Sequence, residues 1–384
     1  MMKFFKKISW LYIILLFVVG CSEVFTGEGH DVNIKREIKA VEKKVPDALI
    51  TRRVRLGGFG DVLIHGRVYD DARVNGGFDF TPMVEPLMPY MSRYDILTAN
   101  QETMIGGVAH GLSTYPRFNS PKEVGDLLKY MGVDIVNLAN NHTLDRGEAV
   151  IQSALKHWDA LDIPYIGSYK DETDQQELRL IEKNDIRFAF LGYTYGTNGI
   201  PIPNGKDHLV SIIDEEQMIM DIKAAKKVAD VIVMHVHFGL EYERMPNNEQ
   251  KRLAQAMIDE GVDVIFGHHP HVLQPAEWIE REDGSRGFVI YSLGNFLSGQ
   301  DQLYRQLGGI VNITVEKTGN RIQLKDPEML LTYVDFNLTP KRDYRVYPLS
   351  DVTHEMLTNH KTVEEELKQH YRQWLPDITF IGSD

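Results

Sequence analysis

The chain has 384 residues, of which 43% are hydrophobic and 25% charged, with a single cysteine and a formal net charge of −13. This is the composition of a globular protein, and the length suffices for one large domain or two. The acidic balance argues against nucleic-acid binding, which requires a basic surface. We therefore expect no nucleic-acid partner.

The first twenty residues have the pattern of a signal peptide. Three lysines precede an unbroken apolar run at residues 10–19. This run is too short for a transmembrane helix, which needs about 20 residues, and it fits the apolar region of a signal peptide. Gly20 and Cys21 follow and resemble a bacterial lipobox, in which the cysteine is lipidated. We expect a lipoprotein signal peptide at 1–20 and a lipid anchor on Cys21. The alternative is a short uncleaved anchor.

Either form of the N-terminus places the remaining chain on the extracytoplasmic face of the cell membrane. Residues 21–50 are polar and charged with little periodicity, which is typical of a tether. Beyond the tether, short apolar runs alternate with amphipathic stretches. Strands are expected at 54–59, 95–99, 134–139, 164–167, 231–237 and 264–267, a hairpin at 178–181 and 187–193, and helices at 81–91, 121–131, 147–161, 214–229 and 247–260.

After residue 270 the pattern changes to strands without helices between them. These strands are expected at 276–280, 287–293, 309–316, 321–325 and 330–334, and one helix follows at 363–374. Helix–strand alternation followed by antiparallel strands predicts an α/β layered domain with a β-rich C-terminal portion. The predicted domain spans 51–335, and a C-terminal tail with a helix spans 336–384.

Polar side chains with metal-ligating groups gather where the predicted strands end. In chain order they are Asp61, His65, Asn100, Glu102, Asn141, His142, His235, His237, Glu241, His268, His269 and His271. In layered α/β folds, sites form outside the carboxyl ends of the strands, so five segments are expected to converge on one crevice. The donors are carboxylate, imidazole and carboxamide without thiolate, which suits Mn, Fe or Zn.

The strongest single signal is the stretch 267–271, Gly-His-His-Pro-His, because three histidines between glycine and proline have little structural use. His235 and His237 alternate with Val236 and therefore face the same side of a strand. One of the two could be a core residue, and we favour His237 for function because it lies nearer the strand's end. A lone His65 has an equally good interpretation as a lining residue.

Taken together and in order, these motifs resemble the CapA family of poly-γ-glutamate capsule biosynthesis proteins, over about residues 52–300. The motifs are Gly60-Asp61, Asn100-x-Glu102, Leu138-Ala139-Asn140-Asn141-His142 with Asp145 and Gly147, His237-Phe238-Gly239-Leu240-Glu241-Tyr242, Gly267-His268-His269-Pro270-His271-Val272 and Tyr291-Ser292-Leu293-Gly294-Asn295-Phe296. That family is similar in turn to calcineurin-like metallophosphoesterases. The resemblance implies a four-layered αββα sandwich with a two-metal site at the strand ends.

The resemblance also implies roles for the residues at the strand ends. The implied metal ligands are Asp61, Glu102, Asn141, His237, His268 and His271. Glu102 is a better bridging ligand than Asn100, because a carboxylate can hold two cations. His142 is the implied general acid, so His142 and Glu102 are the catalytic candidates. His65, Asn100, His269 and Glu241 are expected to contact substrate. The Ser292–Phe296 loop is interpreted as structural, since Gly294 and Asn295 suit a tight turn.

Two functions follow from this pattern. The first is a metal-dependent enzyme, resembling a metallophosphoesterase, that acts on an anionic polymer such as poly-γ-glutamate during its assembly or export. The second is a non-catalytic subunit that binds polymer or metal within a membrane synthase–exporter complex. Whether the chain is an enzyme stays open at this point.

Overall fold

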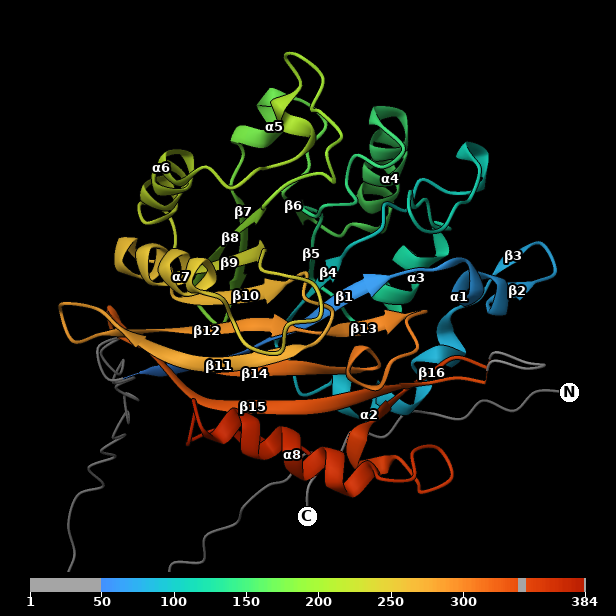
Figure 1. Ribbon diagram of the computed structural model, residues 1–384. Coiled ribbons are helices and arrows are strands. Elements are labelled where there is room, and N and C mark those ends of the chain that lie inside the picture. Colours follow the sequence, from blue (N-terminus) through green and yellow to red (C-terminus); the bar gives the residue numbers. More distant parts are fainter. Residues whose placement is uncertain (1–49, 338–342, 383–384) are drawn as a thin grey trace, which may run out of the picture. The chain divides into compact units, whose positions relative to one another are not determined.

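The computed structural model describes residues 50–337 and 343–382 (Figure 1). The expected signal peptide, Cys21 and all of the tether except residue 50 lie outside the described residues. The first sheet runs in the order β16 (Arg345–Pro348), β15 (Arg321–Asp335), β14 (Leu307–Thr318), β1 (Thr51–Leu63), β4 (Ile96–Gln101), β5 (Ile135–Asn137) and β6 (Tyr165–Ile166). Two short strands join it, β13 (Asn295–Ser298) beside β1 and β17 (Thr379–Phe380) beside β15.

The second sheet runs in the order β11 (Leu273–Glu280), β12 (Arg286–Leu293), β10 (Val264–His268), β9 (Val231–His237), β8 (Ile186–Thr194) and β7 (Arg179–Lys183). Its side chains alternate between two cores, as the period of two in a strand requires. In β8, Phe188 and Phe190 belong to the core shared with the first sheet, whereas Ala189 and Leu191 belong to the core beneath the helices. A small separate ribbon is made by β2 (Arg73–Val74) and β3 (Gly77–Phe78).

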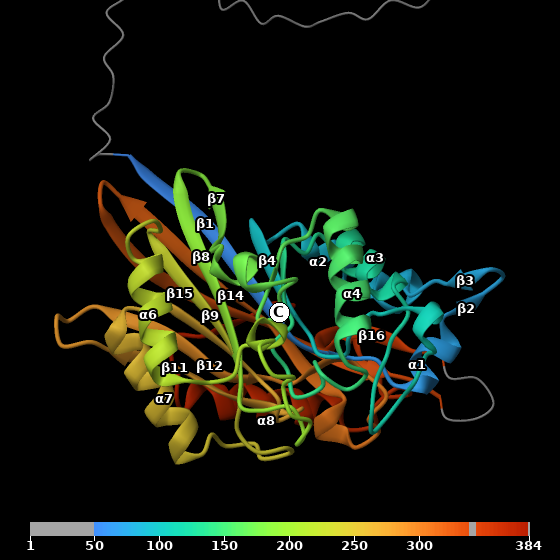
Figure 2. The same cartoon turned by 90° about the horizontal axis from the view of Figure 1, so that it is seen from above.

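Helices cover the outer faces of both sheets, which completes four layers (Figure 2). The first sheet is covered by α3 (Glu123–Tyr130) and α4 (Glu148–Leu161), which bury Leu128 and Trp158. The second sheet is covered by α6 (Glu215–Ala225) and α7 (Asn248–Glu260). The predicted αββα sandwich is therefore confirmed. No helix in the described ranges is both long and apolar enough to cross a bilayer.

The late strands complete the two sheets. The hairpin of β11 and β12 forms one edge of the second sheet, and β14, β15 and β16 extend the first. The two strands predicted at 321–325 and 330–334 form the single strand β15. The region predicted as a tail packs on the same body, because α8 (His360–Arg372) buries Val363, Leu367 and Tyr371 in the core between the sheets.

The predicted helix at 81–91 is wrong. The segment forms two 3₁₀ turns, η2 (Thr81–Met83) and η3 (Glu85–Leu87), followed by the short helix α2 (Met88–Met91). Each piece carries a proline at its first or second position. Proline is tolerated there but removes a hydrogen bond from a helix interior, so three prolines divide one helix into three. The remaining short elements are α1 (Gly66–Asp71), α5 (Glu172–Gln176), η4 (Val108–His110), η5 (Asp207–Leu209), η6 (Leu303–Arg305) and η7 (Leu349–Asp351).

Candidate metal centre

The strand ends of both sheets meet at one buried cluster. Asp61 lies near the end of β1 and pairs in register with Asn100 of β4, which places Glu102 just beyond. His237 and His268 are the last residues of β9 and β10 and are direct partners in the parallel register. The carboxyl ends of parallel strands lie at the same edge of a sheet, which is why residues far apart in sequence converge here.

Asp61, Glu102 and His271 form the centre of this cluster. Each offers one ligand atom, and these atoms lie within 4.8 Å of one another. The Nδ1 atom of His271 is 3.0 Å from Asp61 Oδ2 and 3.7 Å from Glu102 Oε2. Both carboxylate oxygens of Glu102 are buried without a hydrogen-bond partner in the described structure. A buried carboxylate without a partner is costly, so the site fits a bound cation.

The other three predicted ligands surround this centre. His237 Nε2 lies 3.7 Å from Glu102 Oε1 and 3.0 Å from Asn141 Oδ1. His268 Nδ1 lies 3.8 Å from Asp61 Oδ1 and has no hydrogen-bond partner within the described ranges. The six predicted ligands, Asp61, Glu102, Asn141, His237, His268 and His271, are called the metal centre below, and their binding of a metal stays a prediction.

Two residues predicted to contact substrate also offer metal donors. Glu241, His269 and His271 form a second group whose ligand atoms lie within 4.8 Å of one another. The backbones of His269 and His271 have positive φ angles of 98° and 58°. Such angles are unusual for residues other than glycine and often occur at functional sites. His271 is therefore shared between two potential cation positions.

Burial shifts the pKa values of the titratable groups in the metal centre, in different directions for different groups. Burial lowers the pKa of His268 and of His269 to about 3, and burial also holds the pKa of His237 well below its ordinary value. These imidazoles are neutral and keep a lone pair for a ligand bond. Burial raises the pKa of Glu102 well above its ordinary value. For His271, burial lowers the pKa, but Glu102 and Asp61 outweigh it and raise the pKa to about 9.

His142 forms a hydrogen-bonded pair with Asp145 beside the metal centre. Its Nδ1 atom lies 2.7 Å from Asp145 Oδ2, which also accepts a bond of 2.7 Å from the backbone N–H of Phe118. The ring of Phe118 meets the His142 ring edge-on at 4.7 Å. Asp145 therefore holds Nδ1 and the ring orientation, which leaves Nε2 for chemistry.

Asn100 and His65 have partners within the protein. Asn100 donates to Asp61 Oδ1 at 2.7 Å and accepts from Asn137 at 2.8 Å, so it orients the Asp61 carboxylate, a predicted ligand. The Nδ1 atom of His65 lies 3.1 Å from the Leu63 carbonyl and 3.2 Å from the Gly299 nitrogen. Burial lowers the pKa of His65 to about 4. Substrate contact by these two side chains stays a prediction.

Two contacts of the site were not anticipated from the sequence. Asn295 Oδ1 lies 3.1 Å from His271 Nδ1, although the loop around it was interpreted as a structural turn. Asn295 is brought there because β13 pairs in parallel with β1, opposite Asp61. His235 Nδ1 lies 2.9 Å from His268 Nε2. The sequence offered one indication of the His235–His268 contact, namely that His235 and His237 face the same side of a strand.

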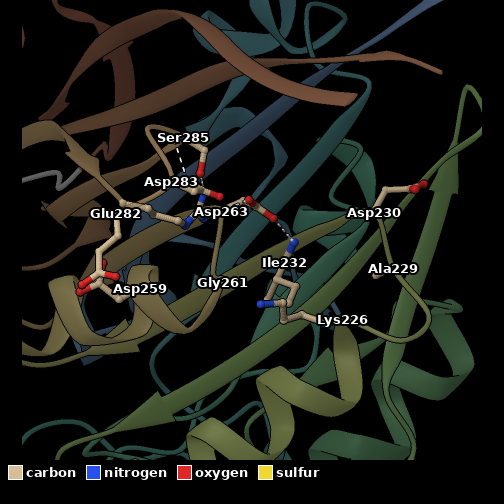
Figure 3. A pocket seen from close by; sticks show the side chains of 11 residues that line it. Lys226, Ala229, Asp230, Ile232, Asp259, Gly261, Asp263, Glu282, Asp283 and Ser285 are labelled. Atoms are coloured by element: carbon tan, nitrogen blue, oxygen red, sulfur yellow. Dashed lines mark hydrogen bonds and ion pairs between the residues drawn. The ribbon is translucent and has the colours of Figure 1, made fainter. Parts of the chain in front are cut away.

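A hollow of about 670 Å³ lies at the other end of the second sheet, where β9 and β10 begin (Figure 3). Its central carboxylate, Asp263, accepts from the Ile232 backbone at 2.9 Å and pairs with Arg281 at 3.1 Å. The Arg281 guanidinium also donates to two backbone carbonyls. The Asp263 carboxylate and the Arg281 guanidinium therefore bond to the backbone and to each other at this end of the sheet. The hollow is separate from the metal centre.

Known proteins are similar in sequence to this chain. The family model described as "Bacterial capsule synthesis protein PGA_cap" matches residues 55–300. "Capsule biosynthesis protein CapA" of Bacillus anthracis is 26% identical over 338 residues, 81% of this chain and 79% of the relative. "PGA biosynthesis protein CapA" of Bacillus subtilis (strain 168) is 34% identical over 200 residues, 52% of this chain and 51% of the relative.

Solved structures also align with this chain. The calcineurin-like phosphoesterase YfkN from Bacillus subtilis is 13% identical, with a TM-score of 0.45 and coverage of 84% of this chain and 99% of that one. A 5'-nucleotidase precursor from Thermus thermophilus is 14% identical, with a TM-score of 0.44 and coverage of 83% and 60%. The family match extends over most of the layered domain and includes every predicted ligand. The chain belongs to the bacterial capsule synthesis protein PGA_cap family.

Proposed function

We propose that the protein is a lipid-anchored, extracytoplasmic component of capsule biosynthesis that acts on an anionic polymer such as poly-γ-glutamate through a metal-dependent, hydrolase-like site. The family supports the pathway. The observation that carries the site is the convergence of Asp61, Glu102 and His271, with both oxygens of Glu102 lacking a partner among the described residues. A donor set of this kind holds a divalent cation.

The metal centre would hold Mn, Fe or Zn. Such an ion, when bound, polarises a substrate oxygen and lowers the pKa of a bound water. The chain's own contribution is to present carboxylates and imidazoles together in a cluster that is buried from bulk water. Asn100 and Asn295 fix the orientation of Asp61 and His271 by direct hydrogen bonds. Such outer contacts tune the ligands they touch.

His142 is the proposed general acid. Asp145 pairs with Nδ1 of His142 and fixes the ring orientation, so that Nε2 is the atom from which a proton would pass to a leaving oxygen. Asp145 is itself fixed by the Phe118 backbone, so the pair has a defined geometry before substrate arrives. The proton then returns to His142 from solvent or from the attacking water.

Two assays test this function. The purified protein with Mn²⁺ should hydrolyse a generic phosphodiester, and Asp61→Ala, His142→Ala and His271→Ala should each remove that activity. The same three variants should abolish polymer output in cells. Full polymer output from His142→Ala with its metal retained would contradict the catalytic role and favour the alternative, a non-catalytic subunit that binds polymer or metal within a membrane synthase–exporter complex.

The anchor has its own test. The sequence around Cys21 supports lipidation, and a lipid chain combined with membrane partners is expected to hold the protein at the membrane. Cys21→Ser should release the protein from the membrane fraction while its purified domain keeps the same unfolding temperature. Unchanged membrane association of Cys21→Ser would contradict the lipid anchor.

A further inference from the structure

One arginine at the edge of the metal centre has no carboxylate partner in the described ranges. Arg305 ends η6, and its guanidinium carbon lies 3.4 Å from the ring centroid of Tyr242. The neighbouring arginines are neutralised, because Arg67 pairs with Asp301 at 3.5 Å and Arg244 pairs with Glu366 at 2.8 Å. Arg305 is half-buried, so its position is set by packing against Tyr242.

Two contacts tie Arg305 to the metal centre. Asn295 Nδ2 donates to the Arg305 carbonyl at 2.8 Å, while Asn295 Oδ1 lies 3.1 Å from His271 Nδ1. The ring of Tyr242 lies 6.1 Å from the ring of His271, and its backbone N–H bonds to the Pro270 carbonyl at 2.8 Å. Tyr242 therefore contacts the segment that carries His271 directly, and Arg305 is linked to His271 through Asn295.

We infer that Arg305, held by Tyr242, forms an anion-binding subsite beside the metal centre that takes a carboxylate or phosphate group of the substrate. A guanidinium stacked on an aromatic ring through its face keeps its edge N–H groups free. Those groups form a fork that matches a carboxylate or phosphate in two hydrogen bonds. This subsite rests on the proposed function, because it deepens the recognition of an anionic substrate.

The negative net charge of the protein means that an anionic substrate needs a local positive group for binding. A chain with a net charge of −13 repels an anionic polymer over most of its surface. Attraction then has to come from local positive charge. Glu241 is a neighbouring acid; it offers a donor to the cation position with His269 and His271 and bonds the Tyr242 hydroxyl. Metal bound there would neutralise Glu241 and leave Arg305 as the free cation of this rim among the described residues.

The test compares two arginines that stack on aromatic rings. Arg286 lies 3.8 Å from the centroid of Trp278 but stands at the start of β12, at the end of the sheet away from the metal centre. Binding of inorganic phosphate and of γ-linked tetraglutamate to the full-length, Mn²⁺-loaded protein would be measured by calorimetry at low salt. Arg305→Gln should weaken binding of at least one of these two anions by about tenfold or more, and Arg286→Gln should leave both unchanged.

The two anions identify the source of the recognised group. Loss of phosphate binding alone assigns a phosphate group to the subsite, and loss of tetraglutamate binding assigns a carboxylate. Arg305→Lys keeps the charge and loses the fork, so it should bind with intermediate affinity, and it serves where Arg305→Gln fails to fold. Equal affinity of Arg305→Gln and the unchanged protein, or no binding of either anion, would overturn the subsite. The proposed function fails separately, if the metal-loaded protein neither hydrolyses a phosphodiester nor supports polymer output.

Discussion

The imidazole of His235 lies parallel to that of His268, with His235 Nδ1 only 2.9 Å from His268 Nε2. Both rings are buried, and burial lowers the pKa of His268 to about 3 and that of His235 well below its ordinary value. When both rings are neutral, a hydrogen bond between these two nitrogens requires one of them to carry the proton and the other to accept it. When His268 Nε2 donates it, His268 Nδ1 keeps a lone pair facing Asp61, 3.8 Å away.

This pairing predicts that His235 controls metal affinity. Replacing an outer hydrogen-bond partner of a ligating histidine typically weakens metal binding by about 10–100-fold. His235→Leu removes the acceptor and should show a loss in this range, measured by competition with a metal-binding dye. His235→Asn offers an oxygen near the position of Nδ1 and should keep most of the affinity. If the two variants bind metal equally well, His235 is merely a core residue.

The pair of His142 and Asp145 predicts a loss of turnover without a loss of metal. Asp145→Asn removes the carboxylate that orients the His142 ring, and general acid catalysis contributes about 10²–10⁴-fold. We expect phosphodiester turnover with Mn²⁺ to fall within that range while metal content stays unchanged. His157 and Asp126 form a comparable pair on the surface, at 3.2 Å, so His157→Asn is the matched control. Full turnover by Asp145→Asn would exclude His142 as an oriented acid.

Gly60 predicts a stability effect next to the metal centre. A Cβ atom at Gly60 would lie 1.9 Å from the Gly294 carbonyl oxygen. The same oxygen accepts a hydrogen bond from the Asp61 backbone N–H. Gly60→Ala should therefore lower the free energy of unfolding by about 1–3 kcal/mol, measured by chemical denaturation, because β1 and β13 must separate. Gly196 has open space around it, so Gly196→Ala should change little. Equal stability of both variants would contradict this close approach.

The convergence of the candidate residues was predictable from the sequence, because parallel strands place their carboxyl ends at one edge of a sheet. The strand predicted at 231–237 matches β9, and His237 stands at its end as expected. Asp61, Glu102 and His271 come together although more than 160 residues separate Glu102 from His271. Polar residues directly after apolar strands were sufficient to predict this convergence, once a layered α/β topology with parallel strands was assumed.

Other features depended on contacts that no local pattern encodes. Asn295 reaches His271 because β13 pairs with β1, a pairing set by tertiary structure. His269 and Glu241 join a second donor group with His271, and His269 and His271 both adopt positive φ angles in their loop. Asn100 faces Asp61 through a side-chain bond that its position in sequence does not reveal. Strand register, loop conformation and side-chain direction therefore depend on tertiary contacts that the local sequence pattern does not specify.

The most direct test of the central claim is the metal content of the purified full-length protein, measured by mass spectrometry after incubation with Mn²⁺, Fe²⁺ or Zn²⁺ and gel filtration. At least one equivalent of metal should remain with the unchanged protein. Glu102→Gln should lose the metal, because the amide keeps the shape of the side chain but removes the negative charge that binds a cation. Thermal unfolding of both proteins checks that the substitution leaves the fold intact. Absence of stoichiometric metal from the unchanged protein with all three ions would contradict a metal centre at Asp61, Glu102 and His271.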